Sequence, residues 1–170
     1  ISATLSVRPA VPYMASFDSG YESGGNKAVV LSRRLYPQLA AQKASASASP
    51  LVLVDGLNTY LENFPHGCTE QVVSQVFPLI GLMQHAGFAA QAEQTQQKVA
   101  VLINRLRPRQ LSNGGFSLWP GGRATAEFPS VYVMHFLTEA RAMGYAVPGD
   151  MYARGLDYLR QVAGNGASDL

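Results

Sequence analysis

The chain has 170 residues, a formal net charge of +2, 47% hydrophobic residues and 14% charged residues. This length suits one ordinary domain, or a small domain with part of another, and the composition permits a buried core. The small charge, without a basic stripe, gives no electrostatic support for nucleic-acid binding. No apolar stretch reaches the length of a membrane span. Because the chain begins with Ile1 rather than Met, we expect a processed chain or a fragment of a longer protein.

Residues 1–49 have the patterns of β-structure. Residues 3–9 alternate apolar and polar side chains, and residues 27–36 form a second strand-like run around Val29 and Val30. Residues 42–49 alternate Ala and Ser, which is typical of a weak edge strand or a linker. Since these runs have no evident closing partners, we predict a β-rich segment that forms only part of a domain.

From Pro50 onward the apolar period becomes helical, and Pro50 itself stands just ahead of a helix start. Pro78 should kink the second helix, and the glycine-rich residues 113–122 should form a compact turn. Helices paired through Gly- and Pro-rich turns predict an array of helical hairpins over residues 50–170 rather than a four-helix bundle. The predicted helices cover residues 51–64, 68–87, 90–106, 128–143 and 148–162.

Cys68 is the one cysteine of the chain, which excludes a disulfide framework and a multi-cysteine zinc site within it. A lone thiol is usually a small buried hydrophobe. Here its context changes that interpretation, because Gln71 follows three residues later, near a predicted helix start, and such residues share a helix face. Attack of the thiolate on the Gln71 side-chain carbonyl carbon, with loss of ammonia, would leave an internal thioester.

Three conditions favour this chemistry. The helix N-terminus is expected to lower the pKa of the Cys68 thiol, because unsatisfied N–H groups favour the thiolate. Gly67 is expected to permit the sharp entry into the helix, and Pro65 to stiffen the approach. The bond also needs a dry, mostly apolar surround, since water would hydrolyse it.

At residues 64–71, Phe-Pro-His-Gly-Cys-Thr-Glu-Gln, the chain resembles the Pro-x-Gly-Cys-x-Glu-Gln signature of thioester-containing proteins. This family comprises the alpha-2-macroglobulins, complement components and bacterial alpha-2-macroglobulin-like proteins. Residues 51–62 resemble the helix before the thioester in the bacterial members, and residues 113–119 resemble the Gly-aromatic turn of the same domain. Arg8-Pro9, Gly20 and residues 34–37 resemble the β-segment that leads into it, so the resemblance covers nearly the whole chain.

The resemblance implies a mainly α fold, in which residues 50–170 form the N-terminal portion of an α/α toroid, the thioester domain, and residues 1–49 belong to a CUB-like domain. It implies a broad-spectrum protease inhibitor rather than an enzyme. Cleavage of a bait region elsewhere in the parent protein would expose the thioester, and a Lys amine of the protease would attack the Gln71 carbonyl. The implied partners are target proteases and the remaining domains of the parent chain, without a metal or cofactor. The implied location is the periplasm, with membrane association through the parent protein.

One departure from the family concerns histidine. Complement members that acylate hydroxyls place a His after the Gly-aromatic turn, whereas residues 117–129 contain none here. Amine targets are therefore favoured, and His135 is interpreted as an ordinary helix residue. Phe116 and Trp119 are expected to anchor the turn by packing.

The supporting residues and the rival functions remain open at this level. Glu70 either favours the helix dipole or takes a direct chemical part, and His66 is either a base for the thiol or a surface residue. One rival function is a hydrolase with Cys68 as nucleophile and His66, His85 or His135 as base. Another is a sugar- or isoprenoid-processing enzyme, since α/α toroids also host those reactions, although paired catalytic carboxylates are not evident.

Overall fold

The computed structural model describes residues 52–62, 64 and 66–166, together with the isolated positions 19–21, 24, 44 and 46. The chain divides into two compact units, residues 1–60 and 61–170. Nearly all of the predicted β-rich segment, residues 1–49, lies outside the described residues. Its β-structure, and a domain boundary after residue 49, therefore stay predictions.

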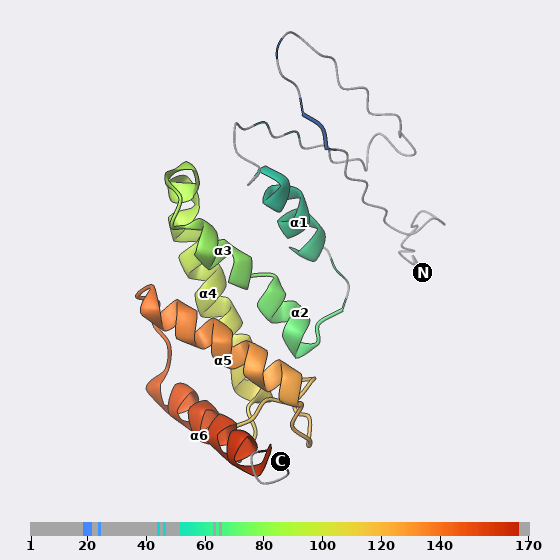
Figure 1. The fold of residues 1–170 in the computed structure, drawn as a ribbon, viewed down its shortest axis with the longest axis vertical. Coiled ribbons are helices and arrows are strands. Elements are labelled where there is room, and N and C mark those ends of the chain that lie inside the picture. The colour runs from blue at the N-terminus through green and yellow to red at the C-terminus, as the bar shows by residue number, and fades with distance from the viewer. Residues whose placement is uncertain are drawn as a thin grey trace, which may run out of the picture. The chain divides into compact units, whose positions relative to one another are not determined.

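The described part of the chain is mainly helical, as predicted, with helices close to the expected positions (Figure 1). Short 3₁₀ helices at Ala86–Gln91 and Arg107–Arg109 flank α4. None of the described helices is long and apolar enough to cross a membrane. The α-helices are α1 (Val52–Glu62), α2 (Thr69–Ser74), α3 (Phe77–Leu82), α4 (Ala92–Leu106), α5 (Glu127–Ala142) and α6 (Gly149–Gly166).

The structure corrects the prediction of one long helix kinked at Pro78. Two short helices, α2 and α3, replace it, and they are separated by Gln75 and Val76. Pro78 lies in the first turn of α3, where a backbone N–H has no partner within the helix anyway. Pro78 therefore starts a new helix instead of bending an existing one.

The helices of the second unit are arranged as hairpins. Helices α5 and α6 run side by side in opposite directions, joined by a short connection, and α2 and α3 both pack against α5 (Figure 1). Helix α4 contacts α2 and leads into the turn region before α5. Residues far apart in the sequence thus meet around the N-terminal end of α2.

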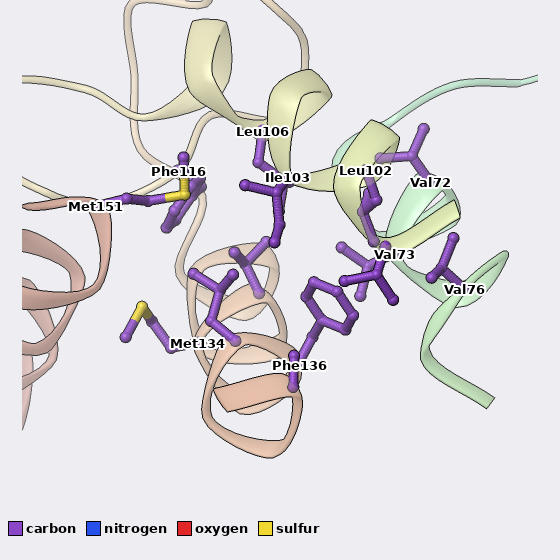
Figure 2. Packing of buried hydrophobic residues seen from close by; sticks show 14 of the residues in the cluster. Val72, Val73, Val76, Leu102, Ile103, Leu106, Phe116, Met134, Phe136 and Met151 are labelled. Atoms are coloured by element: carbon purple, nitrogen blue, oxygen red, sulfur yellow. The ribbon is translucent and has the colours of Figure 1, made fainter. Parts of the chain in front are cut away.

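The core of this unit is a single apolar cluster to which α2, α4, α5, α6 and the turn all contribute (Figure 2). In α5 the buried residues Val133, Phe136, Leu137 and Ala140 recur at the spacing of one helix face. From α2, Val72 and Val73 are 1% and 0% exposed, so the residues directly after the Cys68–Gln71 segment are fixed in the core. Figure 2 labels Val72, Val73, Val76, Leu102, Ile103, Leu106, Phe116, Met134, Phe136 and Met151.

Candidate functional site

Cys68 is the residue that caps the N-terminus of α2. Its backbone is extended, with φ −64° and ψ 163°, and the chain becomes helical at the next residue. The side chain is 6% exposed, so the thiol is nearly closed off from solvent. Burial follows from the neighbouring residues, because Thr69 and Val72 are themselves inaccessible.

Gln71 folds back onto Cys68 in a capping-box arrangement. The Cys68 backbone N–H donates to the Gln71 Oε1 atom at 3.3 Å, and the Gln71 backbone N–H faces the Cys68 side chain. The carboxamide is therefore held over the first turn, beside the residue that carries the thiol. This is the mutual placement that the spacing of the two residues predicted.

The expected lowering of the Cys68 pKa is wrong, because the structure raises it. Burial of the thiol is the main cause, and the Glu70 side chain adds to it, both as a hydrogen-bond partner and by its charge. The backbone N–H of Gln71 acts in the opposite direction, as the helix-terminus argument requires, but it is outweighed. With only six residues, α2 also has a weak dipole.

Glu70 lies next to the thiol. Its Oε2 atom is buried and, among the described residues, has no hydrogen-bond partner. Its backbone carbonyl accepts a hydrogen bond from the Ser74 hydroxyl at 2.8 Å. An unpaired carboxylate oxygen beside a thiol can accept a proton, so a direct chemical part for Glu70 stays a prediction beside the helix-dipole role.

Thr69 ties the start of α2 to the Gly-rich turn. Its backbone N–H donates to the Leu118 carbonyl at 2.9 Å, and its buried hydroxyl donates to the Ser117 carbonyl at 2.6 Å. Thr69 is thereby hydrogen-bonded to residues 117 and 118, almost fifty residues away in the sequence, and its buried polar groups have partners.

Arg109 adds further hydrogen bonds to this contact between the start of α2 and the turn. Its guanidinium is 4% exposed and donates to the Gly67 carbonyl at 2.9 Å, to Thr69 Oγ1 at 3.0 Å and to the Leu118 carbonyl at 3.3 Å. The Nε atom donates to the Arg105 carbonyl at 3.1 Å. Burial, followed by the charge of Arg105, lowers the pKa of Arg109. We refer to Arg109, Thr69 and the carbonyls of Gly67 and Leu118 as the Arg109 cluster.

Sequence reasoning missed the Arg109 cluster. Thr69 falls at a variable position of the signature, and Arg109 is one of 13 basic residues with nothing local to mark it. A weak signal existed in the position of Arg109, four residues before the glycine-rich turn begins at Asn113. Its partners, however, lie 40 and 42 residues away, beyond the reach of periodicity or spacing.

The histidines lie away from the thiol's interactions. In the described part of the chain, the residues that interact with the Cys68 side chain are Glu70, Gln71 and, through its charge, Arg109, and they include no histidine. His66 is exposed, with its ring 5.4 Å from that of Phe64, and His85 is exposed at the start of a 3₁₀ helix. His135 packs edge-on against a phenylalanine of α3 and lies 3.9 Å from a glutamate one turn further along α5.

Two expectations about the surrounding residues are corrected. Gly67 does not have a positive φ, and a Cβ added to it would meet only Arg105, at 3.8 Å, so the entry to α2 does not require glycine for its conformation. Trp119 does not anchor the turn, since it is 49% exposed. Phe116 does, being fully buried in the core.

Comparison with known proteins places this chain in a family, although no family model matches it. The chain is 34% identical to an alpha-2-macroglobulin of Rickettsia conorii over all of its length, and 33% identical to an alpha-2-macroglobulin homolog of Yersinia pestis over 99% of it. It spans only 9% and 8% of those two proteins, respectively.

Solved structures agree with these relatives. A crystal structure of native Escherichia coli alpha-2-macroglobulin, from domain MG7 to the C-terminus, matches 62% of this chain with a TM-score of 0.54 and 34% identity, over 17% of its own length. A cryo-EM reconstruction of the native E. coli protein matches 64% of this chain with a TM-score of 0.55 and 33% identity, over 7% of its length. The chain therefore belongs to the bacterial alpha-2-macroglobulin-like proteins, of which it spans one segment.

Proposed function

We propose that Cys68 and Gln71 close an internal thioester, through which the parent protein captures attacking proteases covalently. The observation that carries this proposal is the folded-back carboxamide, whose oxygen accepts a hydrogen bond from the Cys68 N–H at 3.3 Å. A glutamine at the third position of a helix folds back in this way in an ordinary capping box. Here it is held against the residue whose sulfur must reach it.

Closure of the bond balances without a co-reactant. The sulfur of Cys68 attacks the Cδ atom of Gln71, so an S–C bond forms and the C–N bond of the carboxamide breaks. The nitrogen leaves as ammonia and carries away the thiol proton. Glu70 is suited to move that proton, because its unpaired, buried Oε2 atom is free to accept it beside the thiol.

Capture of a protease reverses this reaction, with an amine of the protease in place of ammonia. A Lys amine of the protease attacks the same carbonyl carbon, an amide bond forms, and the sulfur leaves and takes up the proton released by the amine. Each chain then carries a spent thiol, so we propose an inhibitor with a single-use bond and not an enzyme.

The burial of Cys68 supports the same proposal, since a thioester persists only where water is excluded. The absence of a histidine in residues 117–129 favours amines over hydroxyls as targets. The partners we propose are target proteases and the other domains of the parent protein, and the location we propose is the periplasm. A cysteine hydrolase is less well supported, because no described histidine interacts with the thiol.

The test is the mass of the freshly prepared parent protein before and after exposure to methylamine. We expect a mass lower by one ammonia than the sequence requires, a Cys68 that resists iodoacetamide, and gain of one methylamine with release of an alkylatable thiol. The matched control is Gln71→Asn, which keeps a carboxamide but shortens its reach by one methylene. A full sequence mass together with an unmasked thiol in the wild-type protein would overturn the proposal.

A further inference from the structure

The buried guanidinium of Arg109 is bonded to the peptide unit that carries the Cys68 N–H. Arg109 Nη2 donates to the Gly67 carbonyl at 2.9 Å, and that carbonyl shares one planar peptide with the nitrogen of Cys68. The same nitrogen donates to Gln71 Oε1 at 3.3 Å. Two hydrogen bonds and the peptide between them therefore connect the guanidinium to the oxygen of the reacting carboxamide.

Two physical effects follow from this connection. Because the peptide is planar and trans, holding its oxygen fixes the direction in which its N–H points. A cation bonded to the carbonyl also polarises the peptide and makes its N–H a stronger donor, since hydrogen bonds in series reinforce one another at low dielectric. Burial of Arg109 increases both effects, because little solvent competes for its donors.

The geometry points to Arg109 as a positioning residue for the thioester, which acts through the Gly67–Cys68 peptide to orient and strengthen an oxyanion-stabilising N–H at Gln71 Oε1. This inference rests on the proposed function and deepens it. When sulfur or an amine attacks the Gln71 carbonyl carbon, the negative charge develops on that oxygen. The Cys68 N–H faces it both in closure and in capture.

The other bonds of the Arg109 cluster fix the guanidinium in place. Its Nη1 atom donates to Thr69 Oγ1 at 3.0 Å and to the Leu118 carbonyl at 3.3 Å, and its Nε atom donates to the Arg105 carbonyl at 3.1 Å. A lysine would place a positive charge nearby, but it could not reproduce this planar fork. One donor of the guanidinium thus bonds to the Gly67 carbonyl, and the other donors hold the guanidinium in position.

The experiment measures aminolysis in the full-length parent protein, with methylamine as the probe. In the fraction of Arg109→Gln that has closed its thioester, we expect the second-order rate constant to fall about tenfold. This is less than the loss of a direct oxyanion donor, because Arg109 acts through a peptide. Arg109→Lys should lie between this variant and wild type. Arg107→Gln is the matched control, since Arg107 is exposed on the same 3₁₀ helix.

A second readout separates positioning from folding. In protein labelled with ¹³C at glutamine, the infrared band of the thioester carbonyl, identified by its loss on methylamine treatment, should move to higher frequency in Arg109→Gln, because its hydrogen bond weakens. A purely structural role would lower the closed fraction without altering this band. If circular dichroism shows Arg109→Gln to be unfolded, Arg109→Lys carries the test by the same two measurements.

The outcomes are distinguishable. A wild-type rate and an unchanged carbonyl band in the folded Arg109 variants would overturn the inference and leave the proposed thioester standing. Wild-type protein without the loss of ammonia would overturn the proposed function, and this inference with it. A slower rate with a shifted band in the Arg109 variants, but not in Arg107→Gln, would support the inference.

Discussion

Two connections between helices of the second unit differ in how far they are buried. The exposed connection, residues 83–91 between α3 and α4, contains no buried residue. The buried connection, residues 107–126 between α4 and α5, contains Arg109, Phe116 and Ser117, which are 4%, 0% and 1% exposed. The second is the one that contacts the start of α2.

The difference shows what a buried turn requires. Backbone groups removed from water need partners, and the buried connection supplies them. The Ser117 N–H donates to the Arg109 carbonyl at 2.8 Å, the Leu111 N–H to the Gly115 carbonyl at 2.9 Å, and the Gln110 side chain to the Met151 carbonyl of α6 at 2.9 Å. The exposed connection can leave such groups to solvent. The connection beside Cys68 thus depends on hydrogen bonds that water cannot replace.

The largest effect that would test this comparison is expected from Gly114→Ala. Gly114 has φ +90°, and a Cβ there would run into the Arg154 carbonyl of α6. Strain and overlap together should lower the free energy of unfolding by about 2–4 kcal/mol. Urea unfolding of the chain, followed by far-UV circular dichroism, measures the change.

The matched control lies in the exposed connection. Gly87 has no positive φ, and a Cβ there would have open space around it. Gly87→Ala should leave the free energy of unfolding within about 0.5 kcal/mol of wild type. Equal losses from the two substitutions would mean that the burial of a connection does not decide how much it contributes to stability.

A smaller loss is expected from Ser130→Ala, at the point where α5 supports the buried connection. The fully buried Ser130 hydroxyl accepts a hydrogen bond from the Phe116 N–H at 2.8 Å and donates to the Ala126 carbonyl at 2.7 Å. Its removal leaves the Phe116 N–H buried and unpaired, which should cost about 1–3 kcal/mol. The same unfolding measurement checks this.

Thr138→Ala serves as its control on the same helix. The Thr138 hydroxyl also bonds to a carbonyl one turn earlier, that of Met134 at 2.8 Å, but the residue is exposed and water can replace the bond. We expect a change of no more than about 0.5 kcal/mol. A loss from Thr138→Ala as large as that from Ser130→Ala would contradict the role given to burial.

The smallest effect concerns the titration of Cys68 and its dependence on Glu70. In the Gln71→Asn background, where the thiol stays free, iodoacetamide alkylation should have its midpoint above the ordinary pKa of a thiol, because burial and then Glu70 raise the pKa. Glu70→Gln should move the midpoint to lower pH. An unchanged midpoint would mean that Glu70 does not influence the pKa of the Cys68 thiol.

The raised pKa of Cys68 also makes the free energy of unfolding depend on pH. A thiol whose pKa is higher in the folded state than in the unfolded state binds its proton more tightly when folded. The resulting stabilisation is fully present below the unfolded pKa and is lost as the pH rises through the folded pKa. In the Gln71→Asn background, Glu70→Gln should weaken this dependence, which urea unfolding at a series of pH values would measure.

The sequence alone predicted the elements that depend on local patterns. Helices α4, α5 and α6 follow from apolar residues at one-face spacing, and the compact turn follows from Gly114 and Gly115. The placement of Gln71 against Cys68 also follows from a local rule, because both lie in one helical turn. These features need no knowledge of distant contacts.

The remaining features depend on the tertiary structure. The direction of the Cys68 pKa was predicted wrongly, because burial and the position of the Glu70 carboxylate outweigh the helix terminus. Pro78 could end, kink or start a helix, and packing of α2 and α3 against α5 decides among these. Arg109 joins segments some forty residues apart, which no local pattern signals.

The Arg109 cluster consists mainly of main-chain oxygens, and this bears on how the segment can vary in evolution. Carbonyls of Gly67, Arg105 and Leu118 accept from the guanidinium, and every amino acid supplies such a carbonyl. As far as these bonds are concerned, the side chains at those three positions are free to change. We expect mutational constraint to concentrate instead on Arg109 and on the hydroxyl at position 69, so a related chain could diverge widely around this cysteine and still hold it in the same way.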